Sequence, residues 1–344
     1  MIHTSIPNTA SLCERLLTQT PFENLNPDKV IDAIESHGYL SDLRVFPLNS
    51  YENRVYQFGV EEGEPIIAKF YRPQRWSDEQ IQEEHAFSLE LAEMEIPIVA
   101  PIKNDKGISL FHFDEHRFSL YPRRGGHAPD LGDLETLYRL GQQLGRLHAI
   151  GKIKPFKYRP TLDLQSYAIN SRDFLMSNDF IPQTLTEAYS TLSQHLIDRM
   201  QQVFSETPYE TFRIHGDCHP GNILLRPESL WIVDLDDARN GPAIQDIWML
   251  LSGDYPQKCQ QLAEVIEGYE EFCEFDRREI PLIETLRTLR LMHYAAWLAR
   301  RWSDPAFPQA FPWFNSERYW SEHILELREQ MSALDEPSLR LSDV

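Results

Sequence analysis

One stretch of the sequence, residues 214–246, constrains the fold of this chain more than any other. It opens as Ile-His-Gly-Asp-Cys-His-Pro-Gly-Asn-Ile-Leu-Leu and continues with Leu-Trp-Ile-Val-Asp-Leu-Asp-Asp and Gly-Pro-Ala-Ile-Gln-Asp. The apolar residues on both sides of the polar run predict a loop carrying Asp217 and Asn222, beside a short buried strand that ends at Asp234. A loop with one carboxylate and one amide, next to a carboxylate at the end of a strand, provides the groups that magnesium-dependent phosphoryl transfer requires.

The residue types of this stretch suit distinct chemical roles. Asp234 and Asn222 offer the oxygen ligands that a hard Mg²⁺ ion prefers, whereas Asp217 can accept the proton of a substrate hydroxyl. Asp246 lies near the start of an expected helix, where it can cap backbone N–H groups and brace the loop. A plainer interpretation stands beside each role, because Asp and Asn in loops are commonly turn formers, and the other acids of the stretch can be solvated or capping residues.

A metal-dependent hydrolase is the alternative from another class. His215, Asp217 and His219 form an HxDxH array that a later Asp of the stretch can complete as a zinc or di-metal site. That alternative gives no role to Asn222 or to Lys69, which lies in an expected strand much earlier in the chain. A nucleotide-binding regulator without catalysis is a third interpretation. Cys218 lies in the loop without a dedicated base, which favours a packed thiol over a nucleophile.

Composition excludes several classes of protein. The chain has 344 residues, enough for two domains or one large bilobal unit, and its apolar fraction of 42% indicates a globular protein. A net charge of −20 opposes binding to nucleic acid or to an anionic membrane. We expect neither a transmembrane helix nor a secretory signal, because no apolar run approaches about 18 residues. Four cysteines without CxxC spacing fit a reducing cytoplasm.

The first part of the chain has the period of a β-sheet. We expect an extension at residues 1–22, a short helix at 26–38, strands at 45–48, 54–60 and 66–71, and a hairpin at 108–113 and 117–121. The third strand contains Lys69 among apolar residues, either as an edge lysine or as a functional one. A helix over residues 77–93 carries Glu83 and Glu84, and either side chain can reach Lys69 if this helix packs on the sheet.

The glycine-rich segment 122–129, Pro-Arg-Arg-Gly-Gly-His-Ala-Pro, has the composition of a linker. We therefore place the boundary between lobes there, with an N-lobe at residues 23–121 and a C-lobe at residues 130–344. Helices are expected at 134–151, 183–205, 243–252, 257–273, 279–301 and 316–334, with an irregular segment at 305–313. The leucine stripe of the first makes the adjacent His148 a packed structural histidine. The predicted class is α+β, with a small strand-rich lobe and a larger helical lobe.

The motif His-Gly-Asp-x-His-x-x-Asn at 215–222, followed by Val-Asp-Leu-Asp-Asp at 233–237, resembles a known family. It is similar to the catalytic loop and magnesium aspartate of the aminoglycoside phosphotransferase and choline kinase-like branch of the protein-kinase fold. Other strings resemble a narrower group of that branch, the bacterial stress-response kinases. These strings are Pro47–Phe58, Lys69–Pro73, Ile214–Leu224, Val233–Pro242 and Arg300–Pro308. The resemblance covers residues 23–340 and implies a bilobal protein-kinase-like fold.

The resemblance also implies roles at the matching positions. Asp217 matches the catalytic base, and Asn222 and Asp234 match the magnesium ligands. Lys69 matches the phosphate-binding lysine, with Glu84 as the better match for its ion-pair partner and Glu83 as the alternative. The residues implied to contact ATP in the nucleotide-binding loop and the adenine-binding hinge are Asn49, Ser50, Tyr51, Phe118, Leu120 and Tyr121. The loop departs from GxGxxG, so Ser50 and backbone N–H groups are left to contact phosphate.

These features predict an ATP- and Mg²⁺-dependent phosphotransferase. The resemblance implies a Ser/Thr protein kinase that phosphorylates proteins, itself included, in the bacterial stress response, as a cytoplasmic monomer. A small-molecule hydroxyl kinase of the aminoglycoside, choline or homoserine type is the alternative within the superfamily. An acidic substrate lobe would suit a cationic small molecule as well as a protein.

Overall fold

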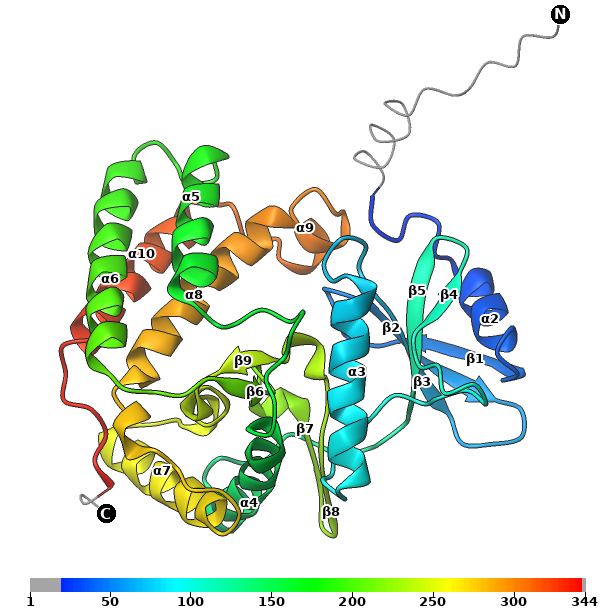
Figure 1. Ribbon diagram of the computed structural model, residues 1–344. Coiled ribbons are helices and arrows are strands. Elements are labelled where there is room, and N and C mark those ends of the chain that lie inside the picture. Colours follow the sequence, from blue (N-terminus) through cyan, green and yellow to red (C-terminus); the bar gives the residue numbers. More distant parts are fainter. Residues whose placement is uncertain (1–19, 342–344) are drawn as a thin grey trace, which may run out of the picture.

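The computed structural model describes residues 20–341, which form a small β-rich lobe and a larger helical lobe (Figure 1). The small lobe contains an antiparallel sheet of five strands in the order β1-β2-β3-β5-β4. The strands are β1 Ser41–Pro47, β2 Arg54–Val60, β3 Ile66–Phe70, β4 Phe111–Phe113 and β5 His116–Pro122. Helix α2, Pro27–Glu35, packs on one face of this sheet. Most of the predicted extension, residues 1–19, lies outside the described residues.

The position of β3 decides between the two interpretations of Lys69. β3 lies between β2 and β5, so Lys69 is on the central strand, opposite Val55 and Ser119, and not at an edge. Its neighbours Ala68 and Phe70 are fully buried in the small core under α2. Because side chains alternate along a strand, Lys69 points to the other face of the sheet, toward the large lobe.

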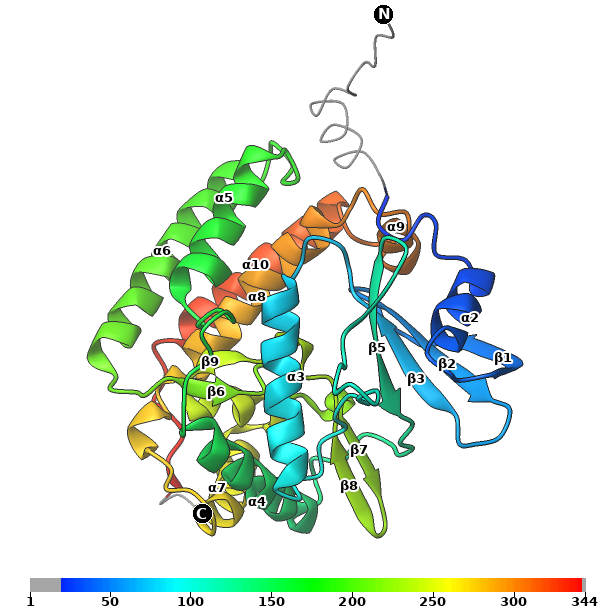
Figure 2. The same ribbon diagram turned by 45° about the vertical axis from the view of Figure 1, so that its right-hand side comes forward.

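Helix α3, Asp78–Glu93, lies between the two lobes in every view (Figures 1 and 2). Its start is fixed by a capping box, in which Ser77 and Gln80 exchange side-chain and backbone hydrogen bonds. Phe87 and Leu91 are fully buried and belong to the core of the large lobe. The helix that we placed in the N-lobe by sequence therefore packs its apolar face against the C-lobe.

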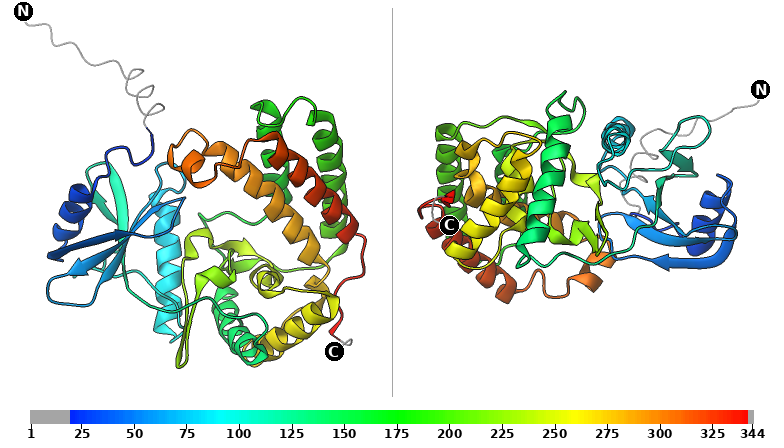
Figure 3. Two further views of the ribbon diagram at one scale, coloured as in Figure 1. Left: turned by 180° about the vertical axis from the view of Figure 1, so that it is seen from behind. Right: turned by 90° about the horizontal axis from the view of Figure 1, so that it is seen from below.

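The large lobe consists mainly of helices, and five of the predicted ones are confirmed. These are α4 Leu134–Gly151, α6 Thr186–Glu206, α7 Tyr255–Glu270, α8 Leu282–Arg300 and α10 Glu317–Ala333. The leucine stripe of α4 is buried as predicted, with Leu137, Leu140, Leu144 and Leu147 all fully inaccessible. Seen from behind, α8 and the following segment reach across to the small lobe (Figure 3). Within residues 20–341, no helix is long and apolar enough to cross a membrane.

Some predicted elements of the large lobe were wrong. Residues 243–252 do not form one helix but two 3₁₀ turns, Ala243–Asp246 and Trp248–Leu250. The reason is that the backbone N–H of Ile244 is held by the buried carboxylate of Glu279, while every side chain from Ala243 to Leu250 is buried. The segment 305–313 contains the short helix α9, Ala306–Ala310. Sequence reasoning also missed α5, Asn170–Ser177, and the π-helical turn Gln165–Ile169 before it.

Two small antiparallel ladders hold the stretch of residues 214–246. β6, Phe212–Ile214, pairs with β9, Arg239–Gly241, and β7, Ile223–Arg226, pairs with β8, Ser229–Ile232. The polar loop connects β6 to β7, and the carboxylate-rich turn connects β8 to β9. The predicted strand before Asp234 is therefore confirmed, and both polar segments leave the ladders on the side of the cleft.

Candidate active site

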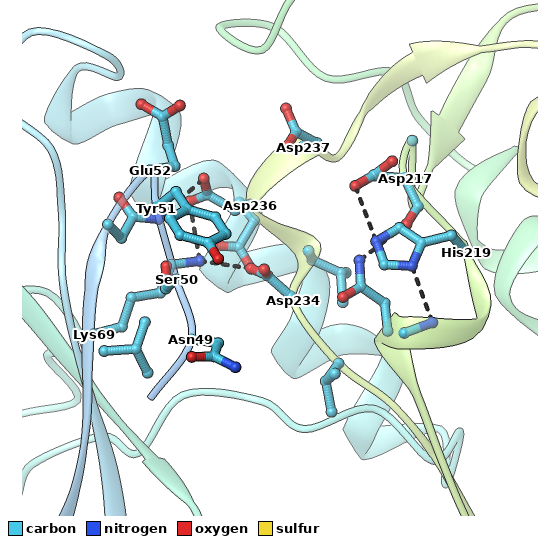
Figure 4. Close-up of a pocket in the computed structure, with 18 of the residues that line it drawn as sticks. Asn49, Ser50, Tyr51, Glu52, Lys69, Asp217, His219, Asp234, Asp236 and Asp237 are labelled. Atoms are coloured by element: carbon cyan, nitrogen blue, oxygen red, sulfur yellow. Dashed lines mark hydrogen bonds and ion pairs between the residues drawn. The ribbon is translucent and has the colours of Figure 1, made fainter. Parts of the chain in front are cut away.

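A cavity of about 760 Å³ separates the two lobes. Its walls come from the β1–β2 loop, from Lys69, from the polar loop 216–222, from the turn 233–237 and from one face of α8. Figure 4 shows Lys69, Asp234 and Asp236 on one side of this cavity, and Asp217 and His219 on the other. The two halves of the predicted site, which are more than a hundred residues apart in sequence, therefore meet.

Asp246 braces the polar loop, as predicted. It is fully buried, its Oδ2 accepts the backbone N–H of His215 at 2.7 Å, and its Oδ1 accepts that of Gly216 at 2.8 Å. Burial opposes ionisation of Asp246, but the hydrogen bond from His148 at 3.0 Å helps to lower its pKa. His148 in turn contacts the hydroxyl of Tyr269 at 2.9 Å, which confirms it as a packed structural histidine.

Gly216 is needed in the loop for a steric reason. Its φ is +86°, and a β-carbon there would lie 2.3 Å from the carbonyl oxygen of Asp237. Only glycine adopts this backbone conformation without strain and also allows such a close approach.

The histidines of the loop are used internally, which argues against the HxDxH hydrolase. Nε2 of His215 lies 2.9 Å from the carbonyl oxygen of Val233, and its Nδ1 accepts the backbone N–H of Asp217 at 3.3 Å. Nδ1 of His219 accepts the N–H of Gly221. In the part of the chain that the structure describes, no three His, Cys, Asp or Glu residues are grouped to hold a metal ion. Cys218 is fully buried, and burial raises the pKa of its thiol, which suits the packed thiol that we expected.

Asp217 lies at the edge of the cavity with a partner that sequence reasoning did not identify. Its Oδ1 forms an ion pair with Arg290 of α8, and its Oδ2 lies 3.6 Å from Nε2 of His219. Its side chain remains 23% exposed, so a ligand in the cavity can reach it. Nothing local in the sequence connects position 290 with position 217, because only the packing of α8 brings them together.

Asn222 and Asp234 present oxygen atoms toward the same space. The Nδ2 of Asn222 donates to the carbonyl oxygen of Asp217 at 3.0 Å, which leaves its amide oxygen available to a ligand. Asp234 has a left-handed backbone, with φ of 62°, and its side chain is 53% exposed. Non-glycine residues seldom adopt this conformation, and functional sites are where such strain concentrates.

Lys69 forms ion pairs with two carboxylates of the turn 233–237 and not with a glutamate of helix α3. Its Nζ lies 2.8 Å from Asp234 Oδ1 and 3.0 Å from Asp236 Oδ1. Burial disfavours the charged form of Lys69, but these two carboxylates outweigh it and hold the lysine pKa well above its usual range. The described residues contain no ion pair between Lys69 and Glu84. The Oε1 of Glu84 accepts from Ser88 at 2.8 Å instead, and burial raises the pKa of Glu84.

Glu83, the alternative partner, has a structural role elsewhere. Its carboxylate accepts the backbone N–H groups of Lys157, Tyr158 and Arg159 at 2.6 to 2.8 Å. It ties α3 to a loop of the large lobe and does not line the cavity. Of the two glutamates, only Glu84 lies at the cavity, which agrees with the preference that the resemblance gave it.

Asp236 is buried and Asp237 is partly buried, and both are bound by arginines. Arg75 binds both, with NH1 on Asp236 and NH2 on Asp237 at 2.8 Å, and Arg239 also binds Asp237 at 2.8 Å. Burial opposes ionisation, but these arginines, with Lys69 at Asp236, hold the pKa of both carboxyls well below the usual range. Sequence reasoning missed Arg75, although it lies two residues beyond the Lys69–Pro73 string.

The predicted nucleotide-binding loop lines the cavity through Asn49, Ser50 and Tyr51. The next residue, Glu52, ties this loop to the large lobe. Its Oε2 accepts from Trp297 Nε1 at 2.6 Å and pairs with Arg301 at 2.6 Å. Two further contacts cross between the lobes close by. Arg72 pairs with Asp304 at 2.7 Å, and the ring of Tyr51 lies 4.7 Å from that of Phe311. We call Glu52, Arg72, Trp297, Arg301 and Asp304 the interlobe clasp.

The three hinge residues divide between the two faces of β5. Phe118 and Leu120 are fully buried in the small core with α2, and their side chains are absent from the cavity wall. The side chain of Tyr121 lines the cavity, and its hydroxyl lies 3.0 Å from that of Tyr71. Pro122, the last residue of β5, lines it too. Side-chain contact with a ligand is therefore limited to Tyr121 among the three.

The chain matches a known protein family in both sequence and structure. The profile of the phosphotransferase enzyme family matches residues 44–283. The chain belongs to the phosphotransferase enzyme family. It is 44% identical over 321 residues to the serine/threonine protein kinase RdoA of Salmonella typhimurium and to stress response kinase A of Escherichia coli. Each alignment covers 93% of this chain and 97% of the relative, which confirms the resemblance predicted from the motifs.

Solved structures of phosphotransferases share the fold at low sequence identity. Amicoumacin kinase hAmiN, in complex with AMP-PNP, Ca²⁺ and Ami, has a TM-score of 0.70 at 17% identity, covering 89% of this chain and 94% of its own. The microcompartment-associated aminopropanol kinase has a TM-score of 0.68 at 16% identity, covering 92% and 100%. Spectinomycin phosphotransferase, in complex with ADP and the antibiotic, has a TM-score of 0.59 at 17% identity, covering 92% and 98%. The predicted bilobal kinase-like fold is confirmed.

Proposed function

We propose that this phosphotransferase is an ATP- and Mg²⁺-dependent Ser/Thr protein kinase that acts as a cytoplasmic monomer in the bacterial stress response and also phosphorylates itself. The observation that carries the chemistry is the meeting of Lys69 and Asp234 at 2.8 Å across the cleft, opposite the loop with Asp217 and Asn222. A cation for phosphate, two oxygen ligands and a carboxylate for a hydroxyl then surround one cavity. The acceptor class is supported by the 44% identity to RdoA, which is named a serine/threonine protein kinase, and the stress response by the equal identity to stress response kinase A.

The residues at the cleft fit a magnesium ion. The exposed carboxylate of Asp234 and the available amide oxygen of Asn222 supply the one or two protein oxygens that Mg²⁺ usually takes, with water and phosphate completing its shell. When bound, the ion neutralises charge on the transferring phosphate. Both ring nitrogens of His215 and Nδ1 of His219 are engaged in the loop, which argues against a zinc-type cage of His and Cys.

The protein's own groups have separate tasks in this proposal. Lys69 binds phosphate oxygens, and Asn49 and Ser50 lie where the β1–β2 loop covers the cavity. Asp217 orients the acceptor hydroxyl and takes its proton, which it can do only from the small exposed part of its side chain. Asp246 fixes Asp217 in place by holding the backbone two and one residues before it.

The test is incubation of the full chain with γ-labelled ATP and Mg²⁺, alone and with casein as a generic protein substrate. We expect label on phosphoserine or phosphothreonine, and a loss of about 10²–10⁴-fold in Asp217→Ala. Asp105→Ala, an exposed carboxylate away from the cavity, is the matched control and should retain the wild-type rate. Label on kanamycin or choline but on no protein would refute the protein-kinase assignment and favour a small-molecule kinase.

A further inference from the structure

One face of α8 forms the wall of the cavity beyond Asp217. Leu286, Leu289, Arg290, His293, Tyr294 and Trp297 line it, and their spacing of three and four residues places them on a single side of the helix. Tyr167, from the π-helical turn, packs on His293 with the rings 4.5 Å apart. Figure 4 shows Lys69 and Asp234 across the cavity from Asp217, and Arg290 of this α8 face pairs with Asp217. An acceptor molecule must therefore meet this wall, which we call the α8 wall.

The charges next to the α8 wall do not suit a cationic acceptor. The carboxylates there are Asp217 and Asp237, together with Glu52, which accepts a hydrogen bond from Trp297 of the wall and pairs with Arg301. Each of the three is paired with at least one arginine. Asp217 pairs with Arg290, and Asp237 pairs with Arg75 and Arg239. His293 adds no negative charge, and burial lowers its pKa to about 3, so it is neutral at physiological pH. No carboxylate of the described wall is left to attract an ammonium group.

Arg290 has more freedom than Arg75, the arginine that holds the neighbouring turn. Its side chain is 45% exposed, whereas that of Arg75 is 15% exposed and held by three carboxylates, with Glu52 at 3.8 Å as the third. Within residues 20–341, Asp217 is the only ion-pair partner of Arg290. A guanidinium has five N–H donors and can bind a carboxylate through two of them at once. Arg290 therefore has donors to offer an acceptor.

Arg290 and an acceptor hydroxyl both bind the carboxylate of Asp217. Of the oxygens of Asp217, Oδ1 is held by Arg290 and Oδ2 faces His219 at 3.6 Å, so an acceptor hydroxyl competes for the same carboxylate. Exposed ion pairs are weak, and Arg290 can exchange its partner at low cost. An acceptor with its own carboxylate gives the guanidinium a new partner as the hydroxyl reaches Asp217. A cationic acceptor offers no such partner and repels Arg290.

We propose that Arg290 is the specificity-determining residue of the acceptor site, and that it selects a Ser or Thr whose neighbouring residues are acidic. This inference rests on the proposed protein-kinase function and adds the chemical class of the peptide. The net charge of −20 opposes the approach of an acidic chain, but such repulsion is screened beyond about 8 Å at physiological salt. Contacts at the α8 wall are shorter than this and decide the preference.

The experiment compares two synthetic peptides that differ only in the residues around one Ser, which are Glu in one and Lys in the other. The measured quantity is the ratio of kcat/KM for the acidic over the basic peptide, in which any general loss of activity cancels. Wild type should favour the acidic peptide by ~10-fold or more, and Arg290→Glu should bring the ratio below one. Arg290→Lys retains the charge and should keep part of the preference. Arg318→Glu, on the exposed face of α10, is the charge-matched control and should leave the ratio unchanged.

The outcomes separate the two proposals. If both peptides are phosphorylated with a ratio near one, or if Arg290→Glu leaves the ratio as it is, the inference about Arg290 is refuted while the protein-kinase function stands. If neither peptide nor casein is phosphorylated, the protein-kinase function fails. A panel of small hydroxyl compounds then tests Arg290, with glycerate as the anion, glycerol as the neutral compound and choline and kanamycin as cations. Preference for glycerate supports the role of Arg290, and preference for a cation overturns it.

Discussion

Replacement of Asp246 by alanine tests whether one buried carboxylate holds the loop that carries Asp217. The side chain is fully buried and receives three donors, which are the backbone N–H groups of His215 and Gly216 and the ring of His148. Alanine removes the acceptor and leaves all three donors inside the protein. A buried donor without a partner costs about 1–3 kcal/mol. The sum is limited by local relaxation, so we expect a loss of roughly 3–5 kcal/mol, the range for breaking a buried charged pair.

Urea unfolding of the wild type and of two variants measures this loss. Asp133→Ala is the matched control, because Asp133 also accepts a backbone N–H, at the N-terminus of α4, but at the surface. Loss of such a cap costs about 1 kcal/mol. Asp246→Ala should be destabilised several times more, and its kcat should fall because the backbone of His215 and Gly216, which positions Asp217, is no longer fixed. Equal losses in the two variants would refute the bracing role of Asp246.

The remaining predictions concern the ligand site, the pH dependence and the interlobe clasp. Asp234→Ala should weaken binding of Mg²⁺-ATP and change the magnesium dependence of the rate; an unchanged magnesium titration would exclude it as a ligand. Burial raises the pKa of Glu279 to about 7, so its folded form retains a proton that the unfolded chain releases. The free energy of unfolding of the wild type should therefore fall, relative to that of Glu279→Gln, by about 1–3 kcal/mol as the pH rises from 4.5 to 7. Urea unfolding that gives the same difference between the two proteins at pH 5 and at pH 8 would contradict this. Glu52→Ala breaks the clasp and should raise the Kd for ATP roughly 5- to 30-fold, about 1–2 kcal/mol; calorimetry that finds the wild-type Kd would show that the clasp does not order the loop.

Features that depend on local sequence were predictable. The leucine spacing of α4, the cap of α3 and the strand that ends before Asp234 are each encoded within a few residues. The bracing role of Asp246 was also predictable from its residue type and its place after Asn-Gly-Pro. In the helices and the strand, the residues that decide the structure lie close together in the chain, whereas the partners of Asp246 are 30 to 98 positions away.

The hinge shows a signal that was present and not used. Side chains alternate along a strand, so Phe118 and Leu120 must lie on the face opposite Tyr121. All three cannot line one cavity through their side chains, and the structure places the first two in the small core. The residues of α5 and of the π-helical turn carry a weaker sequence signal, because their apolar positions follow no sustained period.

Contacts across the cleft were not predictable from the chain alone. Trp297 and Glu52 are 245 positions apart in the sequence. The two arginines of the clasp, Arg72 and Arg301, come from different lobes. Three of the strings that carried the resemblance, at 47–58, 69–73 and 300–308, contain clasp residues, and they meet in space. The strings therefore indicated the family of the chain, but not that they contact one another in the folded protein. The same limit applies to Arg290, since only the packing of α8 brings it to Asp217.

The partners of Lys69 suggest how its charge is balanced during a reaction cycle. Asp234 is half-exposed and in the proposed function turns to magnesium, so its pairing with Lys69 is lost when nucleotide binds. Asp236 is buried, is held by Arg75 and Asn53, and has no such second task. Its contact with Lys69 can persist, and it then orients the lysine toward phosphate.

Glu84 is the residue that the resemblance assigned as the ion-pair partner of Lys69, yet this ion pair is not formed. Burial raises the pKa of Glu84, whereas the cations around Asp236 keep that carboxyl ionised. A lasting partner for a cation must itself stay charged, and by this criterion Asp236 is better suited than Glu84.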